Sequence, residues 1–236
     1  MRFLLLLLAL VVPTPAHAAE RVLTLTSFDT VRVEGPFAVQ VTTGRGSGGR
    51  ISGAYAALET VSVAVEGRTA IVRAGGGVWG ERAVSATGPV LVSLTTGDLS
   101  GVQVVGAGSV SVDRIKGNSA RLVVDGAGSI EVDSVTLDRL DAAAAGSGLL
   151  RLAGNVLEGS VLLRGNGSVD AAGLLIRDAQ LANEGSGAMA VTANRTASVT
   201  QAGSGKITVF GQAACTVSTM GAGSVICRNA RLASAN

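Results

Sequence analysis

Histidine is almost absent from this 236-residue sequence, and its one occurrence is His17. Residues 1–18 have the pattern of a secretory signal peptide, with a basic start, an apolar run over residues 3–12 and a small-x-small motif that ends at Ala18. Cleavage after Ala18 leaves a mature chain without imidazole. This absence excludes Ser-His and Cys-His nucleophile pairs and His-ligated zinc sites.

Aromatic residues, charge and proline are also scarce. Aromatic residues make up 3% and charged residues 15% of the chain, the net charge is +2, and there are 4 prolines. The charge gives no basic stripe for nucleic acid, and 47% apolar residues exclude a disordered chain. No apolar run reaches the roughly 20 residues that span a bilayer. We therefore predict a periplasmic, cell-surface or secreted protein with no nucleic-acid partner, no cofactor, no metal and no membrane span after cleavage.

Glycine, in contrast, is abundant, with 33 residues, about twice the usual share. A Gly-x-Gly element recurs seven times at spacings of 18–20 residues. This period, without helical amphipathicity, predicts a solenoid of stacked strands. The glycine pairs are Gly106 and Gly108, Gly126 and Gly128, Gly146 and Gly148, Gly165 and Gly167, Gly185 and Gly187, Gly203 and Gly205, and Gly221 and Gly223.

Three positions around each Gly-x-Gly are apolar in every repeat: four before, four after and six after the first glycine. Because alternate residues share one face of a strand, these positions predict inward-facing columns. The column four after the glycine is Val110, Ile130, Leu150, Val169, Met189, Ile207 and Val225. The column four before it is Val102, Leu122, Ala142, Val161, Leu181, Val199 and Val217.

The position between the two later columns predicts an outward-facing row. Its central members, Glu131, Arg151 and Asp170, alternate in charge. In-register parallel stacking places successive members about 4.8 Å apart, so that opposite charges attract. The charge pattern therefore supports the same register as the apolar columns.

We assign the glycines to structural turns, because glycine adopts positive φ without a Cβ penalty. A phosphate-binding loop, the alternative, requires a following helix, whereas strand-like Ser-Val-x-Val segments follow here. The sequence thus predicts one right-handed parallel β-helix over residues 19–236. It has N-terminal coils and an irregular cap at 19–100, regular repeats at 101–228 and a tail at 229–236 that closes the other end. An antiparallel sandwich is the alternative, and the constant period argues against it.

The opening of the mature chain and its repeats resemble a known family. Residues 27–33 (Ser-Phe-Asp-Thr-Val-Arg-Val), residues 37–41 (Phe-Ala-Val-Gln-Val) and the Gly-Ala-Gly-Ser-Val repeats are similar to the auto-transporter adhesin head GIN domain. The resemblance spans roughly residues 27–220. It implies a bacterial envelope protein with a parallel β-helix domain and brings no catalytic residues. We therefore predict a non-enzymatic adhesin-like or structural binding module, with a polysaccharide or another envelope protein as its partner.

The two cysteines, Cys215 and Cys227, lie six residues before and six after Gly221. Both fall in inward columns, separated by one corner. In an oxidising compartment they form a candidate disulfide near the C-terminal end. The alternative is a pair of buried thiols that act as small hydrophobic residues.

Asp113 and Asp133 occupy the same position in successive repeats, seven after the first glycine. Stacking brings them about 5 Å apart, close to the carboxylate separation of retaining glycosidases. A polysaccharide-active enzyme is therefore the alternative function. A solvated corner beside Arg114 is the simpler interpretation, and a calcium site lacks the usual nonapeptide motif.

Two further features are left open by the sequence. Trp79 lies in a glycine-rich loop and either stacks on a sugar or caps the open end of the core. Asn183 and Gln201 share the column two before the first glycine, where an inward direction produces a buried amide ladder.

Overall fold

The computed structural model describes residues 19–75, 90–228 and 231–232 of the chain. The expected signal peptide at 1–18, Trp79 and most of the expected tail at 229–236 lie outside the described residues.

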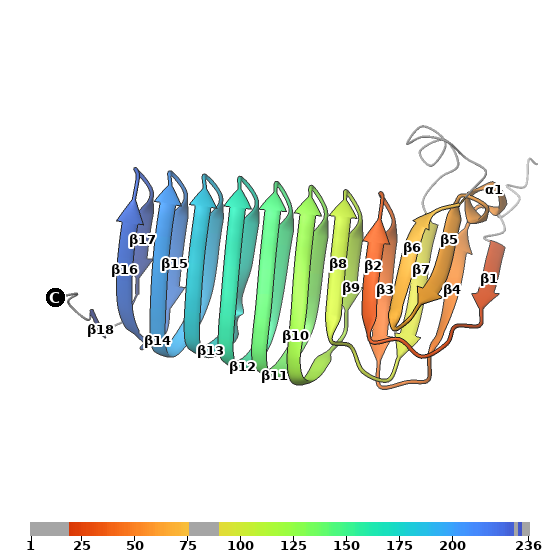
Figure 1. Ribbon diagram of the computed structural model, residues 1–236, viewed down its shortest axis with the longest axis horizontal. Helices are drawn as coiled ribbons and strands as arrows, with labels where there is room; N and C mark the ends of the chain where they lie inside the picture. The colour runs from red at the N-terminus through yellow and green to blue at the C-terminus, as the bar shows by residue number, and fades with distance from the viewer. Residues whose placement is uncertain (1–18, 76–89, 229–230, 233–236) are drawn as a thin grey trace, which may run out of the picture.

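The described chain is a row of stacked β-strands with one short α-helix, α1 (Tyr55–Leu58), which the sequence analysis missed. Figure 1 shows the strands side by side along one axis, with β1 at one end and β16 to β18 at the other. The strands are β1 (Ala19–Leu23), β2 (Thr30–Glu34), β3 (Ala38–Thr43), β4 (Gly48–Gly53), β5 (Val61–Glu66), β6 (Thr69–Ala74), β7 (Val90–Thr96), β8 (Gly101–Gly106), β9 (Ser109–Val112), β10 (Ile115–Gly126), β11 (Ser129–Gly146), β12 (Leu149–Gly165), β13 (Ser168–Gly185), β14 (Ala188–Gly203), β15 (Lys206–Phe210), β16 (Ala214–Met220), β17 (Ser224–Cys227) and β18 (Arg231–Leu232).

Equivalent residues of successive coils lie opposite one another in parallel strands, as predicted. Ile130 of β11 pairs with Val110 of β9 and with Leu150 of β12, and the column continues to Val169 of β13. These four side chains are buried, at 0–1% exposure. The apolar columns therefore form one continuous core, and the predicted parallel β-solenoid is confirmed.

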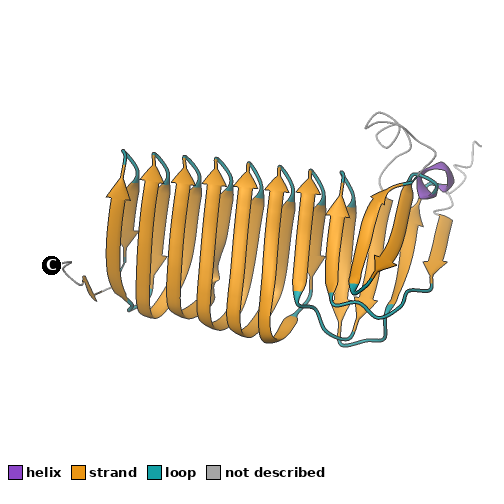
Figure 2. Cartoon of the chain, viewed as in Figure 1, coloured by secondary structure: helices purple, strands orange, loops and turns teal. Residues whose placement is uncertain are grey.

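The Gly-x-Gly corners follow one another along one edge of the solenoid, where they connect successive strands (Figure 2). The two glycines of a corner are required for different reasons. Gly146 has φ +96°, a backbone conformation that favours glycine. At Gly128 φ is not positive, and a Cβ would lie 2.5 Å from the carbonyl oxygen of Gly108 in the coil before. A Cβ on Gly146 would also lie 2.6 Å from the Gly126 carbonyl oxygen, so Gly146 serves both the turn and the close approach of the coils, and Gly128 serves the close approach alone.

The predicted charge row on the outer face is present. Arg151 Nη1 lies 3.3 Å from Glu131 Oε1, and its Nε lies 3.7 Å from Asp170 Oδ2. All three side chains are about half exposed, so the pairs each contribute at most about 1 kcal/mol. The buried columns therefore determine the fold.

The N-terminal coils do not stack in sequence order. Strand β2 lies between β6 and β8, and β3 lies between β7 and β9, all in parallel. The coil formed by β6 and β7 therefore lies nearer the N-terminal end of the stack than the coil formed by β2 and β3, although it comes later in the sequence. Antiparallel strands then cover this end, because β5 pairs with β6, and β4 pairs with β7 and β1.

The C-terminal end is less completely covered. A disulfide joins Cys215 of β16 to Cys227 of β17, with Cα atoms 6.7 Å apart. Val217, predicted to face inward with its column, is instead 37% exposed. The reason is its place in the last coil, since β18 pairs with β16 only at Ala214 and Cys215.

The side chains of Asn183 and Gln201, whose direction the sequence does not determine, face inward. Asn183 and Gln201 pair in register between β13 and β14, and both are almost fully buried. Asn183 Nδ2 donates a hydrogen bond to the Gly187 carbonyl oxygen at 2.8 Å. The core is thus aliphatic through most of the stack and includes amides toward its C-terminal end.

Candidate functional site

Two adjoining grooves run across the coils on the side of the solenoid where each strand bends, away from the Gly-x-Gly corners. We call the larger one the polar groove. It has a volume of about 650 Å³ and extends from Arg139 on β11 to Thr216 on β16. Its outward-facing floor is the in-register row Asp141, Ser160, Gln180, Ser198 and Thr216. Each coil therefore presents one hydrogen-bonding side chain at the spacing of neighbouring strands.

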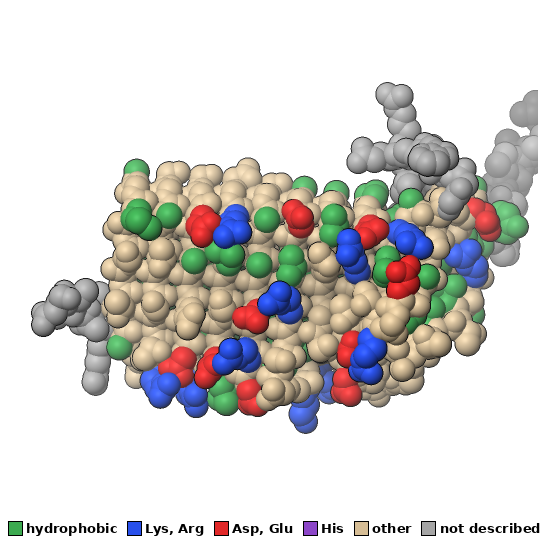
Figure 3. Space-filling model, viewed as in Figure 1, with side chains coloured by type: hydrophobic (Ala, Val, Ile, Leu, Met, Phe, Trp, Pro, Cys, Tyr) green, Lys and Arg blue, Asp and Glu red, His purple; other side chains and the backbone are tan. Residues whose placement is uncertain are grey.

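Charged side chains border the polar groove. Arg139 Nη2 donates to Glu158 Oε2 at 2.6 Å across neighbouring coils. The next member of this row is Asp178, which is opposite Glu158 in the register. Figure 3 shows basic and acidic side chains next to one another on this face.

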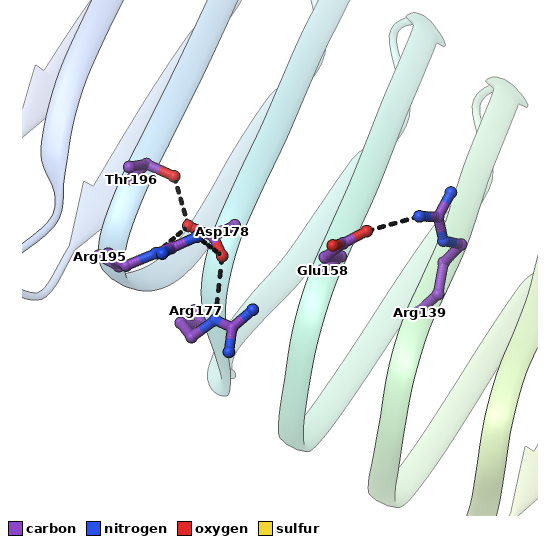
Figure 4. Close-up of polar contacts among 6 residues, drawn as sticks. All are labelled: Arg139, Glu158, Arg177, Asp178, Arg195 and Thr196. Carbon is purple, nitrogen blue, oxygen red and sulfur yellow. Dashed lines mark hydrogen bonds and ion pairs between the residues drawn. The ribbon is translucent and has the colours of Figure 1, made fainter.

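Asp178 is the centre of a denser cluster. Its carboxylate accepts hydrogen bonds from Arg195 Nε at 2.6 Å, Thr196 Oγ1 at 2.7 Å and Arg177 Nε at 3.0 Å. Figure 4 shows these three partners around Asp178, with Arg139 and Glu158 as a separate pair. The hydrogen bonds from Arg195 and Thr196 hold the pKa of Asp178 well below its ordinary value.

This lowered pKa predicts a loss of stability in acid. A carboxyl whose pKa is lower in the folded state stabilises the fold above its unfolded pKa of about 4, and this stabilisation is lost as the pH falls below that value. We expect Asp178→Asn to unfold more easily than the wild type at neutral pH, with a difference that narrows below about pH 4. Urea unfolding of both proteins across this pH range measures the difference. A gap that stays constant down to the most acidic pH contradicts the prediction.

The second groove, which we call the aliphatic groove, adjoins the first and has a volume of about 410 Å³. Its apolar lining consists of Leu137, Val156, Leu157 and Leu175. Leu157 is 43% exposed and Leu175 is 37% exposed, although both lie within long strands of the solenoid. Neither groove is predicted by the sequence.

The predicted acidic pair lies elsewhere. Asp113 and Asp133 directly follow the paired residues Val112 and Val132, and neither lines one of the two grooves. The Asp113 carboxylate accepts hydrogen bonds from the Thr43 amide at 2.9 Å and the Thr43 hydroxyl at 3.2 Å. These contacts give Asp113 a structural role, in which it fastens β9 to the corner after β3.

The stacked parallel coils define the chain as a β-solenoid protein. The chain belongs to the family described as putative auto-transporter adhesin, head GIN domain, whose model matches residues 27–213. Membership in an adhesin-type family implies an extracellular or envelope-associated location.

Solved structures share the fold at low sequence identity. A putative adhesin from Bacteroides fragilis is 18% identical with a TM-score of 0.81, over 89% of this chain and 96% of that one. A protein from Parabacteroides distasonis, titled a putative lipid binding protein, is 18% identical with a TM-score of 0.68, over 89% and 96% of the two chains. A putative adhesin from Parabacteroides merdae is 16% identical with a TM-score of 0.64, over the same shares. Among curated proteins, none matches this sequence.

The described residues include no helix with the length and apolar character to cross a membrane.

Proposed function

We propose that the protein is a non-enzymatic, adhesin-like module of the bacterial envelope that binds an extended polysaccharide along the polar groove. The observation that carries the proposal is the row of outward-facing polar side chains that repeats once per coil. A polysaccharide also repeats its hydroxyl groups along its length, so successive sugars can meet equivalent hydrogen-bonding groups. The expected signal peptide at 1–18 and the family of adhesins support a location in the periplasm, at the cell surface or in the medium.

The chemistry of the groove supports this ligand class. Gln180 and Ser198 are exposed and offer amide and hydroxyl groups that donate and accept hydrogen bonds. Arg139 and Glu158 add a guanidinium and a carboxylate at the border. A groove with polar groups at several successive coils suits a polymer better than a small molecule, because each weak contact adds to the others.

The experiment is affinity electrophoresis of the mature protein in gels that contain dextran, alginate, hyaluronan or peptidoglycan strands. We expect at least one polysaccharide to retard the wild type. The double variant Gln180→Ala/Ser198→Ala is expected to bind about thirtyfold more weakly, because it removes two ligand hydrogen bonds of about 1 kcal/mol each. Its matched control is Gln40→Ala/Ser111→Ala, another exposed Gln–Ser pair on neighbouring coils, outside the groove.

Two outcomes contradict binding along the polar groove. One is migration unaffected by all four polysaccharides. The other is equal weakening in the two double variants, because binding would then not depend on the polar groove. Release of reducing sugar ends during the assay contradicts the non-enzymatic part of the proposal. It would favour the alternative function, a polysaccharide-active enzyme that uses Asp113 and Asp133.

A further inference from the structure

The aliphatic groove has the length and shape of a site for a linear molecule. Its eleven lining residues come from five successive strands, β10 to β14, from Gly117 at one end to Asn194 at the other. Neighbouring strands lie about 4.8 Å apart, so four steps give a length of about 19 Å. A Cβ built on Gly117 meets no atom within 4 Å, which leaves that end open.

The lining of this groove selects hydrocarbon chains over other ligands. Its apolar surface consists of the exposed Leu157 and Leu175, and Leu137 and Val156 lie beneath it, buried in the core. A stable protein interface uses about 20–30 residues on each side, and the groove offers eleven. A single acyl chain covers the two exposed leucines without needing a larger contact area.

Charge distinguishes the two ends of the groove. At the β13–β14 end, Arg177 and Arg195 share the one carboxylate of Asp178, so two positive charges and one negative charge leave a net charge of +1. At the β10–β11 end, Lys116 and Asp138 provide one charge of each sign. Arg177 lines the groove and uses its Nε toward Asp178, while its side chain is 46% exposed. An anionic head group is therefore favoured at the Arg177 end.

We propose that the aliphatic groove binds a long-chain fatty acid as its anion, with the carboxylate at Arg177 and the chain extended across the exposed Leu157 toward Gly117. The aliphatic groove is separate from the polar groove that is proposed to bind polysaccharide. An experiment can therefore rule out binding at one groove without ruling out binding at the other. Arg177 supplies the charge and the open guanidinium nitrogens, and the exposed leucines supply the apolar surface. The ligand lies along the solenoid axis and contacts the four coils from β13 to β10.

The experiment measures equilibrium binding of radiolabelled palmitate to the mature protein. We expect saturable binding to the wild type with one site per chain. The double variant Leu157→Gln/Leu175→Gln is expected to bind about tenfold more weakly, because it removes two exposed apolar side chains from the groove. The control is Leu91→Gln, which changes a leucine that is 41% exposed on β7, outside the groove.

A second variant tests the orientation of the ligand. Arg177→Gln is expected to weaken palmitate about tenfold and to leave competition by methyl palmitate unchanged, because the ester has no charge. Circular dichroism and thermal unfolding verify that each variant is folded, as expected for changes at exposed positions.

Three results overturn the proposal. If palmitate binding is absent or not saturable, the aliphatic groove is not a specific fatty-acid site. Equal weakening by Leu91→Gln shows general adsorption to apolar surface. Strong binding of lysophosphatidic acid without binding of palmitate shows that the head group is a phosphate and that the fatty-acid assignment is wrong.

Discussion

Replacement of Gly146 by alanine is expected to destabilise the protein by about 3 kcal/mol. Gly146 has φ +96°, so an alanine there pays the cost of the left-handed region, about 1–2 kcal/mol. Its Cβ would also lie 2.6 Å from the carbonyl oxygen of Gly126, a backbone atom that is itself held in the stack. Two coils must separate to admit one methyl group, which adds an overpacking cost of about 1–3 kcal/mol. Urea unfolding followed by circular dichroism measures the change.

Gly67→Ala is the matched control for this substitution. Gly67 also has positive φ, +63°, but a Cβ there meets nothing within 4 Å because it lies in the exposed hairpin between β5 and β6. We expect a loss of only about 1 kcal/mol, from the backbone conformation alone. Equal losses in the two variants would mean that close packing of the coils contributes nothing to the requirement for glycine.

Replacement of Leu150 by alanine is expected to cost about 3–4 kcal/mol of unfolding free energy. Leu150 is 0% exposed, and its neighbours in the stack are Ile130 before it and Val169 after it. The backbone ladders on both sides hold the coil in place, so the structure cannot collapse into the space that the side chain leaves. The cost therefore combines the lost apolar burial with that of a cavity.

Leu157→Ala removes the same atoms from the same strand, β12, at a position that is 43% exposed. We expect its unfolding free energy to stay within about 0.5–1 kcal/mol of the wild type. A large loss at Leu157 or a small one at Leu150 would show that the inward column does not carry the stability of the solenoid.

The parts of the fold that follow from strict repetition could be predicted from the sequence. Ile130, Leu150 and Val169 recur at a fixed distance from a glycine, and a column that is apolar in every repeat requires the same inward position in every coil. The charge row of Glu131, Arg151 and Asp170 follows from the same register, one residue away. Local pattern and global fold agree here, so short segments suffice to predict them.

The stacking order of the N-terminal coils could not be predicted in this way. Strands β2 and β6 share the same alternation of buried and partly buried residues over their first four positions, and either could be the neighbour of β8. In the structure β6 pairs with β5 on one side and with β2 on the other, so β2 is the strand that pairs with β8. This arrangement is a tertiary property that the local pattern of each strand does not determine. The irregular sequence before the first Gly-x-Gly gives no column that would settle the order.

The grooves were missed because the register shifts where the strands bend. Bulges lie between Val132 and Val135 of β11 and between Arg151 and Ala153 of β12, so columns counted from the glycines lose their alignment there. Counting backward from the next glycine would have placed Leu157 and Leu175 among polar outward residues. Two leucines at such positions are the one sequence signal for the aliphatic groove.

One-to-one pairing between coils has a consequence for evolution and for engineering. Each middle coil, such as β12, pairs only with the coils on either side of it, and the two ends of the rod carry different coverings. A tandem duplication or deletion of one whole coil would leave both ends intact and change their separation by about 4.8 Å. The domain can thus act as a spacer whose length is adjustable in fixed increments without redesign of its termini.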